Sequence, residues 1–168
     1  MTNAGKTKVE RYLTTALGTM TDQAAIYALD ELTLGTRSRT DFLTKTIQSG
    51  HCVVTKIGST VVGFAVADQS FFDQTFMRLL IVHPGHRRKG IATALIRHIE
   101  GTCPTEKFFT STNASNVPMR RLCEALGFVK SGIIENLDEG DPEIIYFKRL
   151  PTRLELRSLA SDSGREES

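Results

Sequence analysis

Three strand-like segments follow one another in the middle of the chain and limit the kind of sheet it can form. "HCVVTKI" (51–57) and "TVVGFAVAD" (60–68) are rich in β-branched residues, and Gly58–Ser59 between them suits a hairpin turn. The third segment, "TFMRLLIVHP" (75–84), ends at Pro84, which has no backbone N–H to donate in a central ladder. Because tight turns join antiparallel neighbours, these segments predict a mixed sheet and exclude a doubly wound parallel one.

Apolar periodicity places helices and further strands on both sides of these three segments. The predicted order is β-α-α-β-β-β-α-β-α-β-β. Its remaining parts are a strand in 9–17, helices over 21–35 and 39–50, a helix over 90–100, a strand over 107–113, a helix over 116–128, and strands over 131–137 and 142–150. The fold class is therefore α/β (α+β), with a mixed, mostly antiparallel central sheet flanked by helices.

The 168 residues are enough for one domain of ordinary size. We expect this domain to occupy residues 9–150. Residues 1–8 are polar and are expected to be flexible. Residues 151–168 lose the apolar periodicity and fill with Ser, Glu and Arg, so at least the last ten are expected to be disordered.

The overall charge excludes some classes of partner. The 21 Lys and Arg residues nearly balance the 19 Asp and Glu residues, so no global charge attracts nucleic acid or an anionic membrane. No apolar run approaches the roughly 18 residues of a membrane span, and the N-terminus lacks the apolar core of a signal peptide. Cys52, Cys103 and Cys123 are scattered, which favours reduced thiols in a cytoplasmic protein over a disulfide or a metal site.

Local positive charge gathers where a helix is predicted to begin, in "VHPGHRRKGIATALIRHIE" (82–100). His86, Arg87, Arg88 and Lys89 precede Gly90, and the first turn of a helix exposes unpaired N–H groups. The helix dipole adds about half a positive charge there, so a phosphate can dock on such a turn. Neither a Walker loop nor a dinucleotide-binding fingerprint matches. A solvated basic turn is the alternative interpretation.

A more specific pattern lies within this loop. Residues 87–92 fit Q/R-x-x-G-x-G/A directly after a strand that ends "VHP". This resembles the acetyl-CoA-binding signature of the GNAT superfamily of N-acetyltransferases. The downstream segment "NASNVPMRRLCEALGF" (113–128) resembles the second motif of that family, and the strand order is similar over residues 9–150. The resemblance implies the GNAT acyl-CoA N-acyltransferase fold.

The resemblance also implies an acetyl-CoA site and a reaction. The loop and first helical turn would hold the pyrophosphate, the preceding strand would pair with the pantetheine arm, and two asparagines would lie beside that arm. These expected cofactor-binding residues are Leu80, Ile81, Val82, Arg87, Arg88, Lys89, Gly90, Ile91, Ala92, Thr93, Asn113 and Asn116. A neutral primary amine would attack the thioester directly in a ternary complex, with a backbone N–H near Ile81 binding the carbonyl oxygen.

The catalytic residues depart from the family pattern. Cys123 stands where the family commonly has Tyr, so it is either a proton donor to the leaving thiolate or a small buried hydrophobe. The family's Glu near the start of the fourth strand has no counterpart in residues 76–78. His83 and Glu135 are the remaining candidates for the base, and deprotonation through water is favoured over both.

The acceptor side is expected to be acidic. The segment "ENLDEGDPE" (135–143) holds five carboxylates and no basic residue, so it would attract a small cationic amine or a peptide or protein amine; a solvated turn is the alternative. Two other functions compete with acetyl transfer, namely a catalytically silent module that senses acyl-CoA, and nucleic-acid binding through "HRRK". Since many relatives pair through sheet edges, the resemblance is also compatible with a homodimer.

Overall fold

The structure is a computed structural model that describes residues 12–152 and residue 155. The N-terminus expected to be flexible (1–8) lies outside the described residues, and so does most of the polar tail (151–168). Within the described part of the chain, no helix has both the length and the apolar character needed to cross a membrane.

One mixed sheet contains the seven strands of the described residues, in the order β1-β2-β3-β4-β5-β7-β6. The strands are β1 (Leu13–Leu17), β2 (Cys52–Ile57), β3 (Thr60–Phe71), β4 (Gln74–Val82), β5 (Lys107–Asn113), β6 (Val129–Ile134) and β7 (Glu143–Arg149). The helices are α1 (Gln23–Leu34), α2 (Thr40–Gln48), α3 (Ile91–Thr102) and α4 (Val117–Ala125), with short 3-10 turns η1 (Met20–Asp22) and η2 (Pro84–His86). Strands β4 and β5 pair in parallel, whereas β1–β2, β5–β7 and β6–β7 pair antiparallel, which confirms the predicted fold class.

Several boundaries differ from the sequence prediction. Strand β3 continues beyond Asp68 because the turn to β4 falls on Phe72 and Asp73, whose φ angles are 50° and 58°. Two-residue hairpin turns usually end in glycine, as in Asn-Gly or Asp-Gly, so Phe72–Asp73 carries no recognisable turn signal. Helix α3 runs through Gly101 to Thr102, and β6 covers 129–134 rather than 131–137.

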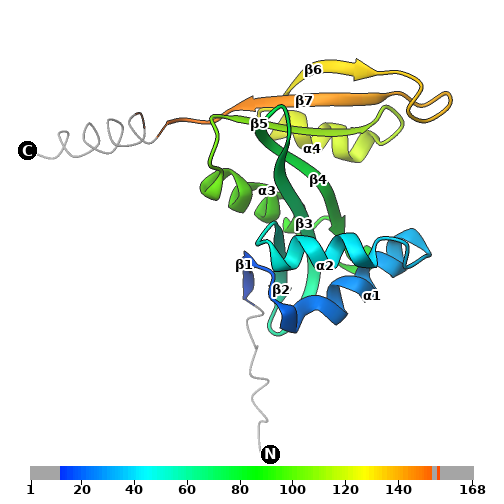
Figure 1. Cartoon of the computed structure of the whole chain (residues 1–168), viewed down its shortest axis with the longest axis vertical. Helices are drawn as coiled ribbons and strands as arrows, with labels where there is room; N and C mark the ends of the chain where they lie inside the picture. Colours follow the sequence, from blue (N-terminus) through cyan, green and yellow to red (C-terminus); the bar gives the residue numbers. More distant parts are fainter. Residues whose placement is uncertain (1–11, 153–154, 156–168) are drawn as a thin grey trace, which may run out of the picture. The chain divides into compact units, whose positions relative to one another are not determined.

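The chain forms two compact units. The first contains the described residues up to Phe64 together with Ile81–Leu95, and the second contains Ala65–Leu80 together with the described residues from Ile96 onward. In the first unit α1 and α2 lie side by side (Figure 1). Its fully buried side chains include Ile26, Leu43, Val54, Val62 and Ile91.

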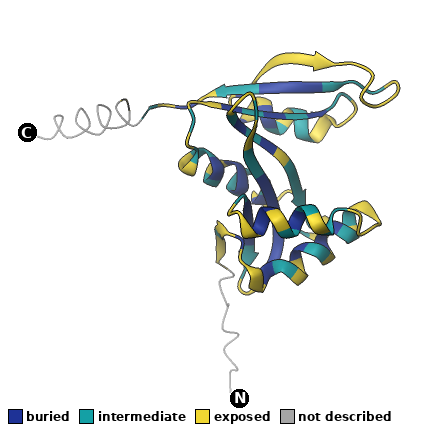
Figure 2. Cartoon of the chain, viewed as in Figure 1, coloured by how far each residue is buried: buried dark blue, intermediate teal, exposed yellow. Residues whose placement is uncertain are grey.

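The second unit is built on the paired strands β5, β7 and β6. Tyr146 and Phe108 are fully buried, and the Phe108 ring meets the Phe128 ring edge-on at 5.2 Å between centroids. Lys148 Nζ donates to the carbonyl of Leu126 at 2.6 Å, at the end of α4, and also pairs with Glu100 at 2.7 Å. Figure 2 shows that β6 is exposed along its length, while its neighbour β7 is buried at its centre.

Candidate functional site

The basic loop after β4 has a defined backbone path. His83 Nδ1 accepts a hydrogen bond from Gly85 N at 3.0 Å, and His86 N donates to His83 O at 2.8 Å, which forms the turn η2. Arg88 and Gly90 then adopt φ angles of 60° and 78°, and α3 begins at the next residue. A Cβ on Gly90 would meet nothing within 4 Å, so the left-handed backbone, rather than protein packing, requires glycine here.

The first turn of α3 supplies hydrogen-bond donors. The bond from Ala94 N to Gly90 O, at 2.9 Å, is the first of the helical ladder. The N–H groups of the three preceding residues, 91–93, therefore have no acceptor within the helix. Arg87, Arg88 and Lys89 are exposed beside them. Backbone donors, a threonine hydroxyl at Thr93 and three cations form a donor set that fits a pyrophosphate.

A glycine that sequence reasoning missed brings α3 close to the sheet. A Cβ on Gly63 of β3 would stand 2.6 Å from Ile91 Cγ2 and 3.1 Å from Ile81 O. Ile91 is fully buried at this contact. The sequence signal was a glycine inside an otherwise β-branched strand, a position that often marks a close approach. Gly63 therefore belongs to the support of the loop.

The parallel pair β4–β5 is short. Its register joins Thr75–Met77 to Phe108–Thr110, although β4 continues to Val82 and β5 to Asn113. The Thr110 hydroxyl donates to Met77 O at 3.1 Å, at the last pair of this register. Leu80, Ile81 and Val82, which were predicted to line the cofactor arm, follow in β4 and are half-buried.

The two predicted asparagines lie around the loop between β5 and α4. Asn116 caps α4, because its Oδ1 accepts from Met119 N at 3.3 Å. Capping occupies this oxygen, so a ligand would meet the Nδ2 donors. Asn113 Nδ2 donates to Asp138 Oδ2 at 2.7 Å, which gives Asn113 a structural bond instead of a free donor.

Cys123 is fully buried in α4. Burial, together with the smaller effect of the Glu124 charge, raises the pKa of its thiol to about 12. Such a thiol gives up its proton reluctantly, which favours the buried-hydrophobe interpretation. Cys52, Cys103 and Cys123 are all free thiols. Among the described residues, no group of His, Cys, Asp or Glu is arranged to hold a metal ion.

His83 and Glu135, the two candidates for the base, differ in their surroundings. The lone pair of His83 Nδ1 is engaged by Gly85 N–H, so in the neutral ring the proton sits on Nε2. This geometry gives His83 a role in the loop and argues against a base. Glu135 is exposed in the connection after β6.

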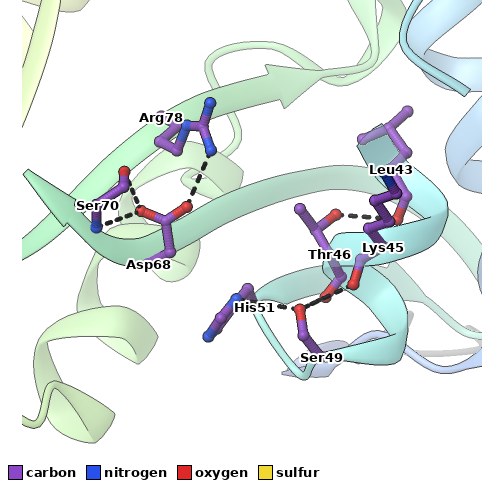
Figure 3. A network of polar contacts seen from close by, with 8 residues as sticks. All are labelled: Leu43, Lys45, Thr46, Ser49, His51, Asp68, Ser70 and Arg78. Carbon is purple, nitrogen blue, oxygen red and sulfur yellow. Dashed lines mark hydrogen bonds and ion pairs between the residues drawn. The ribbon is translucent and has the colours of Figure 1, made fainter. Parts of the chain in front are cut away.

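Asp68 is a carboxylate near the start of β4 that sequence reasoning missed, because it comes from the neighbouring strand β3. Its Oδ1 accepts from Ser70 N at 2.9 Å and its Oδ2 from Arg78 Nη1 at 3.1 Å (Figure 3). Burial alone would raise the pKa of Asp68, but the bonds from Ser70 and Arg78 hold it below the ordinary value. A carboxylate held ionised in this way is a weak base.

The mixed sheet, with a donor-rich loop between β4 and α3, defines a protein of the acyl-CoA-dependent transferase class. The family model described as acetyltransferase (GNAT) family matches residues 21–128. The chain therefore belongs to the GNAT acetyltransferase family, as the sequence motifs indicated, and is an enzyme of that family.

Solved structures agree with this assignment. A GNAT-family acetyltransferase from Bacillus cereus ATCC 10987 is 39% identical, with a TM-score of 0.81, over 84% of this chain and 99% of that one. The ribosomal-protein-S18-alanine N-acetyltransferase from Escherichia coli shares the fold at 19% identity and a TM-score of 0.74, over 84% and 96%. So does yncA from Salmonella typhimurium, solved with its cofactor acetyl-CoA, at 18% identity and a TM-score of 0.68, over 83% and 94%. No curated protein matches the sequence.

Proposed function

We propose that this enzyme moves an acetyl group from acetyl-CoA to a primary amine by direct attack in a ternary complex. The observation that carries the proposal is the first turn of α3, where the N–H groups of residues 91–93 have no acceptor within the helix and follow three cations and a left-handed Gly90. A pyrophosphate satisfies these donors and is favoured by the helix dipole.

Each part of the site has one task in this proposal. The N–H groups of residues 91–93 and the Thr93 hydroxyl bind the pyrophosphate, and Arg87, Arg88 and Lys89 neutralise its charge. The backbone of residues 80–82 pairs with the pantetheine arm, and Asn116 Nδ2 donates to that arm. An N–H near Ile81 binds the thioester oxygen, where negative charge develops during attack.

The chemistry requires two proton movements. As the amine nitrogen bonds to the acetyl carbon, the C–S bond breaks, the nitrogen loses a proton and the thiolate gains one. We assign both movements to water, because the proton of Cys123 is held tightly and Nδ1 of His83 is engaged. Glu135 remains the one candidate side chain for assisting that water.

The acceptor is proposed to be a small cationic amine or a peptide or protein amine. Glu135 and Glu139 lie exposed in the connection between β6 and β7, where their charge attracts a cation. The Escherichia coli neighbour, whose name specifies a protein alanine, illustrates a peptide amine as acceptor.

A screen of amines with acetyl-CoA tests the proposal. We expect free thiol to be released with some polyamines, amino acids or peptide N-termini, and calorimetry to show acetyl-CoA binding without any acceptor. Binding without thiol release across the panel would favour the silent acyl-CoA sensor, which the buried Cys123 also suits. Absence of acetyl-CoA binding would reject both functions.

A further inference from the structure

The acidic connection between β6 and β7 is bonded to the loop between β5 and α4. Asp141 Oδ1 accepts from Ser115 N at 2.9 Å, and its Oδ2 accepts from the Ser115 hydroxyl at 2.6 Å. The next residue contributes a backbone bond, because Ala114 N donates to Pro142 O at 2.8 Å. These three hydrogen bonds join two segments some 26 residues apart in sequence.

These bonds complete the backbone pairing of the β5–α4 loop. Asn116 N donates to Asn113 O at 3.0 Å and Val117 N to Ser115 O at 2.8 Å, both within the loop. The N–H groups of Ala114 and Ser115 depend on the acidic connection instead. Loss of the Asp141 carboxylate would leave Ser115 N without its acceptor, and an unsatisfied backbone donor favours a change of conformation.

A second carboxylate strengthens the same attachment. Asp138 Oδ2 accepts from Asn113 Nδ2 at 2.7 Å, at the end of β5. The hydrogen bonds from Ser115 keep the pKa of Asp141 below its ordinary value, so both of its oxygens are acceptors at neutral pH. Asp138 and Asp141 are therefore engaged with the protein, unlike the free rim carboxylates expected from the sequence.

We infer that Asp141 is a positioning residue for the acetyl-CoA site. It fixes Ser115, and through the chain it fixes the adjacent Asn116, whose Nδ2 donates to the cofactor arm in the proposed function on which this inference rests. The acidic connection thus has two separate tasks. Asp141 holds the cofactor side of the site, whereas exposed Glu139 in the same turn acts on the acceptor side.

The experiment measures acetyl-CoA Kd by calorimetry and acceptor KM at saturating acetyl-CoA. We expect Asp141→Ala and Ser115→Ala each to raise acetyl-CoA Kd about 3- to 10-fold and to leave acceptor KM unchanged. The double variant should bind acetyl-CoA no more weakly than Asp141→Ala, because loss of the Asp141 carboxylate already removes the one bond that Ser115→Ala removes. Asp141→Asn should recover part of the affinity, since its amide oxygen still accepts from Ser115 N.

Glu139→Gln is the matched control, with the same charge change in the same turn. It should leave acetyl-CoA Kd unchanged and raise the KM of a cationic acceptor. Thermal melts identify variants that are unfolded at the assay temperature. If Asp141→Ala is unfolded, the single variants Ser115→Ala and Asp141→Asn take its place. If folded Asp141 variants bind acetyl-CoA as the wild type does, or raise only acceptor KM, the inference is overturned. Failure of the wild type to bind acetyl-CoA would instead reject the proposed function.

Discussion

Gly63 and Ile91 are packed so closely that only glycine fits in the strand: an added Cβ would lie 2.6 Å from Ile91 Cγ2. Ile91 is the first residue of α3, and its side chain is fully buried. The contact therefore sets the height of the first helical turn above β3 and β4. A residue in the middle of a strand thereby controls where the proposed pyrophosphate donors stand.

Substitution of Gly63 by alanine should move that turn. We expect Gly63→Ala to destabilise the fold by about 1–3 kcal/mol through overpacking and to raise acetyl-CoA Kd. Urea melts and calorimetry measure the two effects. Gly101→Ala is the control, because Gly101 lies in the same helix and a Cβ there meets nothing within 4 Å. Equal behaviour of the two variants would contradict the role given to Gly63.

Gly90 tests a different requirement, the left-handed backbone at the start of α3. Its φ of 78° should make Gly90→Ala cost about 1–2 kcal/mol, or else shift the loop, with weaker acetyl-CoA binding in either case. Gly90→Asn should be milder, because asparagine tolerates this conformation better. Calorimetry and melting curves compare the acetyl-CoA affinity and the stability of the two variants. If Gly90→Ala loses less of both than Gly90→Asn, backbone conformation does not control this position.

Sequence patterns predicted well what depends on neighbouring residues. The apolar spacing of α3 and the β-branched runs of β2 and β3 gave their elements, and the loop motif at 87–92 gave the family. The turn at Phe72–Asp73 escaped because Phe72 is not a usual turn former and Asp73, without a following glycine, does not specify a hairpin turn; the strands on both sides impose the positive φ.

Contacts between distant segments could not be predicted in the same way. The Asp141–Ser115 bonds depend on how the β6–β7 connection folds back onto another loop, and nothing in "DEGD" distinguishes a bonded carboxylate from a solvated one. The role of His83 likewise depends on Gly85 N–H reaching its ring. The helices and strands could be predicted from the sequence, whereas the roles of these side chains became clear only from the structure.

Cys123 should behave as a packing residue in catalysis. We expect Cys123→Ala to keep kcat unchanged between about pH 7 and 9, since a thiol with a pKa of about 12 is a much weaker acid than an ordinary thiol, with a pKa of about 8.5, and does not protonate the leaving thiolate. Its stability should fall by about 1 kcal/mol because a fully buried group is lost. Steady-state kinetics across pH and thermal melts measure both. A drop in kcat in the folded variant would restore the thiol as proton donor.

Asp22 should make stability depend on pH at the start of the first unit. It is buried, and although burial raises its pKa, the ion pair with Lys56 at 2.6 Å and the bonds from Thr19 hold the pKa below its ordinary value of 3.8. A lowered folded-state pKa gives stability above pH 3.8 that is lost as pH falls through the folded value. Asp22→Asn should therefore cost about 1–3 kcal/mol at pH 7 and progressively less in acid, as urea melts can measure. Exposed Asp41→Asn is the control, and a pH-independent deficit for Asp22→Asn would contradict the electrostatic origin.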